Sequence, residues 1–370
     1  MNRIACVVPM LLAACAAVAA ADTLPEGAEM ALELPPSEEN PRNSEGDFAT
    51  LEDGRVMFVY THFYGGGGDH AAARLMARYS EDGGRTWSSE DKLVVENEGG
   101  MNVMSVSLLR LDNGRLALFY LRKNSTDDCR PILRISEDEG KTWSEPRLCI
   151  EDPVGYYVVN NDRVVQLEDG RLVIPAARHA LKGEPFGPGH AMCWLSDDHG
   201  QTWVRSETVL KPKPGDGTGW QEPGVVALED GRLMMFIRTR HGSQFLSYSK
   251  DRGNTWSAPE PSDIRSPVSP ASIERIPGTG DLLLVWNDHR DIPPEVKGKR
   301  TPLCTAVSKD EGKTWSNVKT LHDDPEGWYC YTAVHFVDDA VLLGYCSSDA
   351  RYRHLARTEV NRFAADWLYR

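Results

Sequence analysis

Seven residues of this chain have side chains suited to acid–base chemistry, nucleophilic attack or anion binding, and they stand at corresponding places beside predicted β-strands. Three are arginines, in a chain whose formal net charge is −14. An arginine cluster in such an acidic protein predicts an anionic ligand, most simply a carboxylate held by forked hydrogen bonds. The residues are Arg42, Asp69, His70, Glu222, Arg238, Arg300 and Tyr331.

The elements that must position these residues are marked by a repeated motif, Ser-x-Asp-x-Gly-x-Thr-Trp. Its spacing of 53 to 60 residues indicates stacked supersecondary units, none of which could bury its core alone. Ser and Asp side chains bond to nearby backbone groups, and Gly adopts a φ that other residues resist. We therefore interpret the motif aspartates as structural. The five copies begin at Ser80, Ser136, Ser196, Ser249 and Ser308.

A second periodic signal predicts hairpins between the copies of the motif. Asp-Gly or Asn-Gly between two β-rich segments is a strong short-range hairpin signal, and it occurs around Gly54, Gly114, Gly170 and Gly231. Segments 276–281 and 337–340 take the same place in the last two units. Six hairpins and five Trp turns predict an all-β, six-bladed β-propeller of four-stranded units. Residues near Met30–Leu34 should supply the outer strand of the last blade.

Strand direction sorts the candidate residues onto one rim of this propeller. If each first strand starts at the top, the Asp-Gly hairpins and the Ser-x-Asp turns both lie at the bottom. The seven residues stand before first strands, after second strands or before third strands, which places them at the top. We expect them to share one pocket near the axis.

With these residues in view, the chain resembles the Asp-box sialidase superfamily, as a divergent relative of glycoside hydrolase family 33. The segment Trp220-Gln-Glu222-Pro-Gly matches the segment bearing the family's central glutamate, and Tyr331 matches its nucleophilic tyrosine. Arg42, Arg238 and Arg300 match the arginine triad that binds the substrate carboxylate. Asp69 lies in the tetraglycine loop where the family has its acid/base aspartate.

Departures from the family pattern leave several roles open. Arg42 is shifted by two residues. Tyr345-Cys346 stands where a glutamate partner of the first arginine is expected, so Glu45 or Asp47 could substitute. His70 or His62 could share or take over the proton transfer, and Arg122 or Arg178 could replace a member of the arginine triad.

Tyr329 is an alternative nucleophile. Asn161 and Asp162 could contact the glycerol or acyl groups of the ligand.

The resemblance implies a retaining exo-α-sialidase that removes terminal sialic acid from glycoconjugates, without metal or cofactor. Its partner would be a sialylated glycan or glycoprotein. A different exo-glycosidase or lyase acting on another acidic sugar is the first alternative, favoured by the missing glutamate and the added histidine. A non-catalytic carbohydrate-binding propeller is the second.

The first 21 residues are typical of a signal peptide, with Arg3, an apolar segment and Ala19-Ala20-Ala21 as a cleavage site. Residues 22–370 would then form a single catalytic propeller, secreted or periplasmic. Leu12-Ala13-Ala14-Cys15 resembles a lipobox, so a surface lipoprotein attached through Cys15 is the alternative. The apolar segment is too short to span a bilayer. The net charge of −14 argues against nucleic acid, and the six cysteines that follow the first 21 residues lack metal-site spacing.

Overall fold

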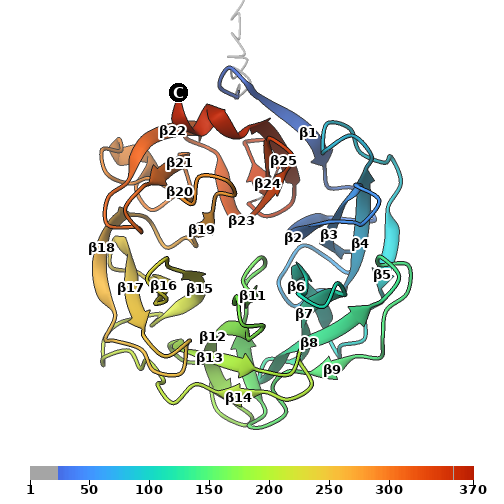
Figure 1. The fold of residues 1–370 in the computed structure, drawn as a ribbon, viewed down its shortest axis with the longest axis vertical. Coiled ribbons are helices and arrows are strands. Elements are labelled where there is room, and N and C mark those ends of the chain that lie inside the picture. Colours follow the sequence, from blue (N-terminus) through green and yellow to red (C-terminus); the bar gives the residue numbers. More distant parts are fainter. Residues whose placement is uncertain (1–23, 353) are drawn as a thin grey trace, which may run out of the picture.

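Five β-sheets surround a central axis in the computed structural model, which describes residues 24–352 and 354–370 (Figure 1). The predicted signal peptide, including Cys15, lies outside the described residues. Such a radial arrangement of mostly four-stranded sheets is the architecture of a β-propeller. The two helices in the described part are short 3₁₀ segments, η1 (Pro294–Val296) and η2 (Ala365–Tyr369).

Four of the sheets have four antiparallel strands each. The first contains β2 (Arg42–Thr50), β3 (Val56–Phe63), β4 (Ala73–Ser80) and β5 (Lys92–Val95). The second contains β15 (Gln221–Ala227), β16 (Leu233–Arg238), β17 (Ser243–Ser249) and β18 (Glu260–Arg265). The third contains β19 (Ser272–Arg275), β20 (Leu282–Asn287), β21 (Leu303–Ser308) and β22 (Ser316–His322).

The fourth four-stranded sheet joins the two ends of the described chain. The N-terminal strand β1 pairs antiparallel with the last strand β25, with Glu33 opposite Glu359, as the sequence predicted for this segment (Figure 1). This pairing closes the ring. The sheet contains β23 (Trp328–Val337), β24 (Ala340–Ser348), β25 (Thr358–Ala364) and β1 (Ala28–Leu34).

The fifth sheet has nine strands, because one parallel pair, Tyr156 opposite Cys129, connects β8 to β10. On either side of this pair the strands run antiparallel. Its strands are β6 (Asn102–Arg110), β7 (Leu116–Ser125), β8 (Asp128–Ser136), β9 (Arg147–Leu148), β10 (Gly155–Val158), β11 (Val165–Gln166), β12 (Leu172–Leu181), β13 (His190–Ser196) and β14 (Val204–Arg205).

The hydrophobic core lies between neighbouring sheets. One cluster joins Met57 and Val59 of β3 to Leu118 and Tyr120 of β7, and another joins the β15–β18 sheet to the β19–β22 sheet. Each sheet thus buries its faces against the next one, which explains why a single unit would not fold by itself.

The repeated motif folds into the same hydrogen-bonded turn at all five places. In the first copy, the Ser80 hydroxyl accepts a bond from the Gly84 N–H at 2.9 Å, and Asp82 accepts bonds from the Thr86 N–H and hydroxyl at 2.8 and 2.7 Å. Equivalent bonds recur in the other four copies. The motif glycines have φ between 73° and 90°, which favours glycine there.

These turns should make stability depend on pH in the acid range. Hydrogen bonds from Thr86, Thr142 and Thr202 outweigh burial and lower the pKa of Asp82, Asp138 and Asp198 to about 2. A carboxyl group whose pKa is depressed in the folded state contributes stability above its unfolded pKa of about 3.9, and this contribution is lost as pH falls toward the folded value.

We therefore expect the free energy of unfolding, measured by urea denaturation, to decrease from about pH 4 toward pH 2. The decrease should be smaller in Asp138→Asn, which removes one titrating group. An identical decrease in the variant would contradict a contribution from this turn.

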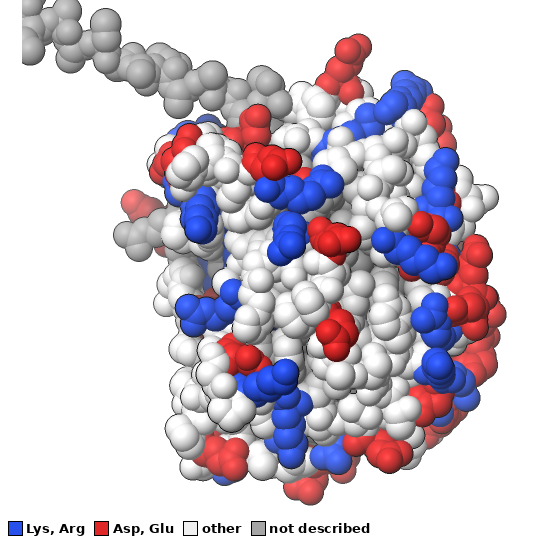
Figure 2. All heavy atoms as spheres, turned by 90° about the vertical axis from the view of Figure 1, so that its left-hand side faces the viewer, with Lys and Arg blue, Asp and Glu red and all other residues white. Residues whose placement is uncertain are grey.

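The side of the ring that carries β18 and β22 has basic and acidic side chains interspersed, without a broad region of one sign (Figure 2). Within the described ranges, no helix is long and apolar enough to cross a bilayer.

Candidate active site

A cavity of about 320 Å³ collects five of the seven predicted residues from distant parts of the chain. Its walls come from the inner strands of several sheets and from the loops that precede or follow them. The predicted residues that line it are Asp69, Glu222, Arg238, Arg300 and Tyr331. The other lining residues include Glu45, Ser105, Lys123, Tyr156, Asn160, His179 and Phe186.

Four of the lining side chains stand at β-bulges in first strands. Glu45, Ser105, Glu222 and Tyr331 have φ values of 54°, 58°, 42° and 59°, in the left-handed region. The strand register shifts at each of these places. Such a conformation costs about 1–3 kcal/mol per residue and persists where the surroundings determine it, often at functional sites.

Tyr331, Glu222 and Arg238 form a connected group. The Tyr331 hydroxyl lies 3.3 Å from Glu222 Oε1, and Arg238 Nη1 donates to the same oxygen at 2.6 Å. Glu222 and Arg238 come from neighbouring strands of one sheet, whereas Tyr331 lies on β23 in another. The group therefore depends on closure of the ring.

The charges of this group prepare the carboxylate to accept a proton. Burial would raise the pKa of Glu222, but the positive charges of Arg238 and Arg300 outweigh it and hold the pKa below its ordinary value. Burial and the Glu222 charge raise the pKa of Tyr331. The phenol is thus protonated in the free protein and stands beside an ionised base.

Two guanidinium groups face the cavity with buried, unused donors, that of buried Arg300 and that of partly buried Arg238. Arg300 is 7% exposed, and its Nε and Nη1 have no hydrogen-bond partner among the described residues. The donor Arg238 Nε likewise has no partner there, and neither has the acceptor Glu222 Oε2. The Arg300 guanidinium also lies 5.2 Å from the ring centre of Tyr331. Buried donors without partners are costly, so this arrangement favours a bound anion.

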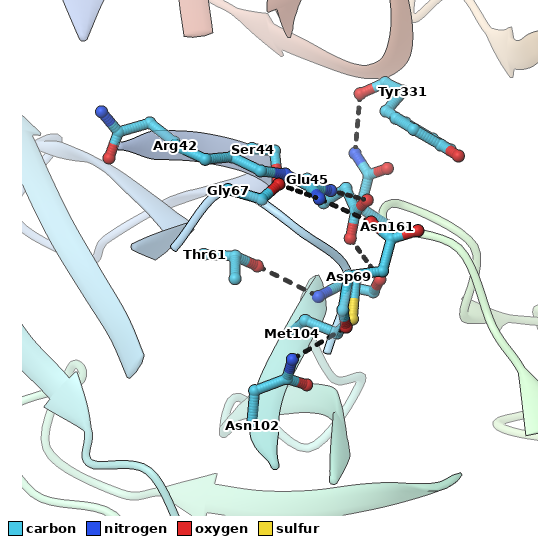
Figure 3. Close-up of polar contacts among 12 residues, drawn as sticks. Arg42, Ser44, Glu45, Thr61, Gly67, Asp69, Asn102, Met104, Asn161 and Tyr331 are labelled. Atoms are coloured by element: carbon cyan, nitrogen blue, oxygen red, sulfur yellow. Dashed lines mark hydrogen bonds and ion pairs between the residues drawn. The ribbon is translucent and has the colours of Figure 1, made fainter. Parts of the chain in front are cut away.

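Arg42 is held by two carboxylates beside the cavity (Figure 3). Its Nη2 donates to Glu45 at 3.0 Å and its Nη1 donates to Asp69 at 2.5 Å. Glu45 therefore fills the place of the missing glutamate partner, one of two possibilities left by the sequence. Asp47, the other one, accepts bonds from the backbone of Phe48 and Leu108.

The two histidines considered for proton transfer lie outside this group. His70 is exposed and does not line the cavity. His62 lies on β3 with its Nδ1 3.8 Å from Asp91, the carboxylate that also accepts a bond from Tyr60. His62 thus faces away from the cavity. A role for His70 stays a prediction.

Arg122 and Arg178 were considered as replacements for a triad arginine, and this interpretation was wrong. Arg238 is the seventh residue after its hairpin glycine Gly231, whereas Arg122 and Arg178 are the eighth after theirs. A shift of one residue turns a strand side chain to the opposite face. The cavity is lined instead by their neighbours Lys123 and His179. The sequence reasoning had not singled out Lys123.

Asn161 and Asp162, considered as ligand contacts, bond to the protein instead. Asn161 Nδ2 donates to the carbonyl groups of Gly46 and Tyr331 at 2.8 and 3.0 Å, and Asp162 accepts from the Val334 N–H at 2.9 Å. They connect inner strands of different sheets. Asn160, one residue earlier, lines the cavity.

The described residues include no group of three or more His, Cys, Asp or Glu side chains placed to hold a metal ion. The six cysteines among them are buried free thiols. Tyr329, the alternative nucleophile, is 1% exposed and stacks on His322 in the core.

Comparison with known proteins places the chain in a family. The model of the BNR repeat-like domain matches residues 102–343. The chain belongs to this family. Within it, this BNR-repeat protein is a relative of the sialidase superfamily, as the sequence predicted.

Curated relatives of this BNR-repeat protein include bacterial sialidases. The sialidase of Bacteroides fragilis is 30% identical, over 57% of this chain and 38% of the relative. That of Clostridium perfringens is 26% identical, over 57% of this chain and 59% of the relative. The chain thus matches about two fifths to three fifths of the length of these relatives.

Solved structures share the fold at low identity. A Hadza microbial sialidase superposes with a TM-score of 0.71 at 20% identity, covering 89% of this chain and 66% of that one. Trypanosoma rangeli sialidase, in complex with difluorosialic acid as a covalent intermediate, gives 0.70 at 17%, covering 94% and 60%. These likenesses support the propeller fold of this BNR-repeat protein.

Proposed function

We propose that the protein is a retaining exo-α-sialidase that hydrolyses terminal sialic acid from glycoconjugates. The observation that carries the proposal is the pair of guanidinium groups, Arg238 and Arg300, whose buried N–H donors are unused beside the Tyr331–Glu222 pair. A sugar that bears a carboxylate next to its anomeric carbon suits this arrangement, because its carboxylate would bind the arginines while its anomeric carbon lies near Tyr331.

In this proposal the arginines hold the sugar carboxylate and Tyr331 attacks the anomeric carbon. The phenol proton passes to Glu222 as the Tyr331–sugar bond forms. A neutral phenol suits this substrate, because a carboxylate nucleophile would be repelled by the sugar's own anion, and sialidases are the tyrosine exception among glycosidases.

Asp69 donates a proton to the leaving glycosidic oxygen as that bond breaks. In the second half, Asp69 takes a proton from water, the water oxygen attacks the anomeric carbon, and Tyr331 leaves and recovers its proton from Glu222. The two inversions give net retention.

The proposal also covers the number of blades, the extent of the catalytic domain and the export of the protein. Divided at its parallel pair, the nine-stranded sheet would give two blades, and the ring would have six. Residues 22–370 would form one catalytic domain. Residues 1–21 would direct export to the periplasm or medium, with lipid attachment at Cys15 as the alternative.

Release of methylumbelliferone from its sialic acid conjugate tests the proposal. We expect turnover of this conjugate and none of the matching uronic acid conjugates. Turnover of a uronide alone would overturn the proposal in favour of a glycosidase or lyase for another acidic sugar. Binding of sialosides without turnover would overturn it in favour of a binding module.

A further inference from the structure

The inference concerns the contact between Arg42 and Asp69, and it rests on the proposed function. The Arg42 side chain is 2% exposed, while that of Asp69 is 62% exposed. Arg42 is fixed by Glu45 at Nη2, by Ser44 at Nε and by the Phe63 ring 4.3 Å away. Asp69 therefore occupies the Nη1 group, which a substrate carboxylate would need if Arg42 joins the other two arginines in binding it.

The main chain of Asp69 is anchored independently of its side chain. Its carbonyl oxygen accepts a bond from Asn102 Nδ2 at 3.0 Å (Figure 3). The same oxygen accepts a bond from Lys123 Nζ at 2.7 Å, and Asn102 also donates to the Ala71 carbonyl. Lys123 is 2% exposed. Because both anchors come from the next sheet along the ring, they hold the glycine-rich loop while leaving the carboxylate able to rotate.

We propose that the substrate carboxylate displaces Asp69 from Arg42, and that the released Asp69 then takes up the proton that it donates to the leaving oxygen. In the free protein Asp69 acts as an internal anion on the arginine cluster. Binding of the correct substrate would thus convert it from a partner of Arg42 into the catalytic acid.

The charges around Asp69 give the direction of this change. Arg42 and Glu45 face it from β2, Lys123 from β7, Tyr156 from β10 and His70 from its own loop. Burial would raise the pKa of Asp69, but Arg42 and then Lys123 hold it below the ordinary value. Loss of the Arg42 contact and arrival of a second carboxylate both disfavour the charged form, so the pKa rises on binding.

Calorimetric titration with the sialic acid glycal DANA, an inhibitor of Trypanosoma rangeli sialidase, tests this. Repeating it in buffers of different ionisation enthalpy gives the number of protons bound. At about pH 5, we expect net proton uptake when the glycal binds, because the pKa of Asp69 rises on binding. Asp69→Asn, an exposed and nearly isosteric change, should take up none.

Removal of the competing charge gives a second readout. At neutral pH we expect Asp69→Asn to bind DANA on the order of five- to tenfold more tightly than the wild type. Equal proton uptake and equal affinity in the two proteins would overturn the displacement while leaving the sialidase proposal intact. Failure of the wild type to bind DANA would overturn both.

Discussion

Tyr331→Phe is expected to reduce kcat on a fluorogenic sialoside about a thousandfold or more. Phenylalanine keeps the ring and its contact with Arg300 but removes the oxygen that would attack the anomeric carbon. A thousandfold loss corresponds to about 4 kcal/mol of barrier, which is reasonable for loss of the nucleophile. Steady-state kinetics with the methylumbelliferyl conjugate would measure it.

Tyr329→Phe is the matched control, since it makes the same chemical change two residues earlier on β23. Tyr329 is buried in the core, where its ring centre lies 4.5 Å from that of His322. We expect kcat to stay within a few-fold of the wild type, because the tyrosine does not line the cavity. A Tyr331→Phe protein that retained most of its activity would exclude this tyrosine as nucleophile.

The elements of the fold could be predicted because their signals are local. The bonds of the Ser80–Trp87 turn join residues at most four apart, so the motif specifies its own geometry. The hairpin at Gly231 similarly placed two strands that the structure has at Gln221–Ala227 and Leu233–Arg238. The first of these strands includes the bulge at Glu222.

The bulges explain most of what the sequence did not reveal. A bulge adds a residue to one strand and changes the face on which later side chains lie. The left-handed φ of Glu45, Ser105, Glu222 and Tyr331 could not be predicted from residue type, because none of them is a glycine. Family resemblance could indicate Glu222 and Tyr331. Glu45, at the same position in another sheet, was indicated only as one of two possible partners of Arg42. Ser105, at that position in a third sheet, became recognisable only from coordinates.

Side-chain direction at the ends of second strands was the other failure. There, whether an arginine side chain faces the cavity depends on whether it is the seventh or the eighth residue after the hairpin glycine. A difference of one residue is smaller than the usual uncertainty of strand boundaries. The seventh residues after Gly114 and Gly170 are Leu121 and Ala177. Lys123 and His179 follow two residues later, on the same face of the strand as these positions.

Glu222→Gln is expected to reduce kcat about 100- to 10,000-fold, the range for loss of a general base. Glutamine preserves the size of the side chain and an oxygen that can accept the Arg238 bond. It does not take a proton from Tyr331, whose raised pKa makes the phenol a poor nucleophile without a base. Kinetics on the same sialoside, with thermal denaturation to verify folding, would measure the effect.

The pH profile separates this role from a purely structural one. In the wild type, kcat/KM should fall at low pH as Glu222 is protonated, at a value below the ordinary glutamate pKa of about 4.3, since Arg238 and Arg300 hold it down. In Glu222→Gln this acidic limb should disappear from the residual activity. Asp69 has the opposite requirement, because it must be protonated to act. A limb that persisted unchanged in the glutamine variant would mean that another group accepts the phenol proton.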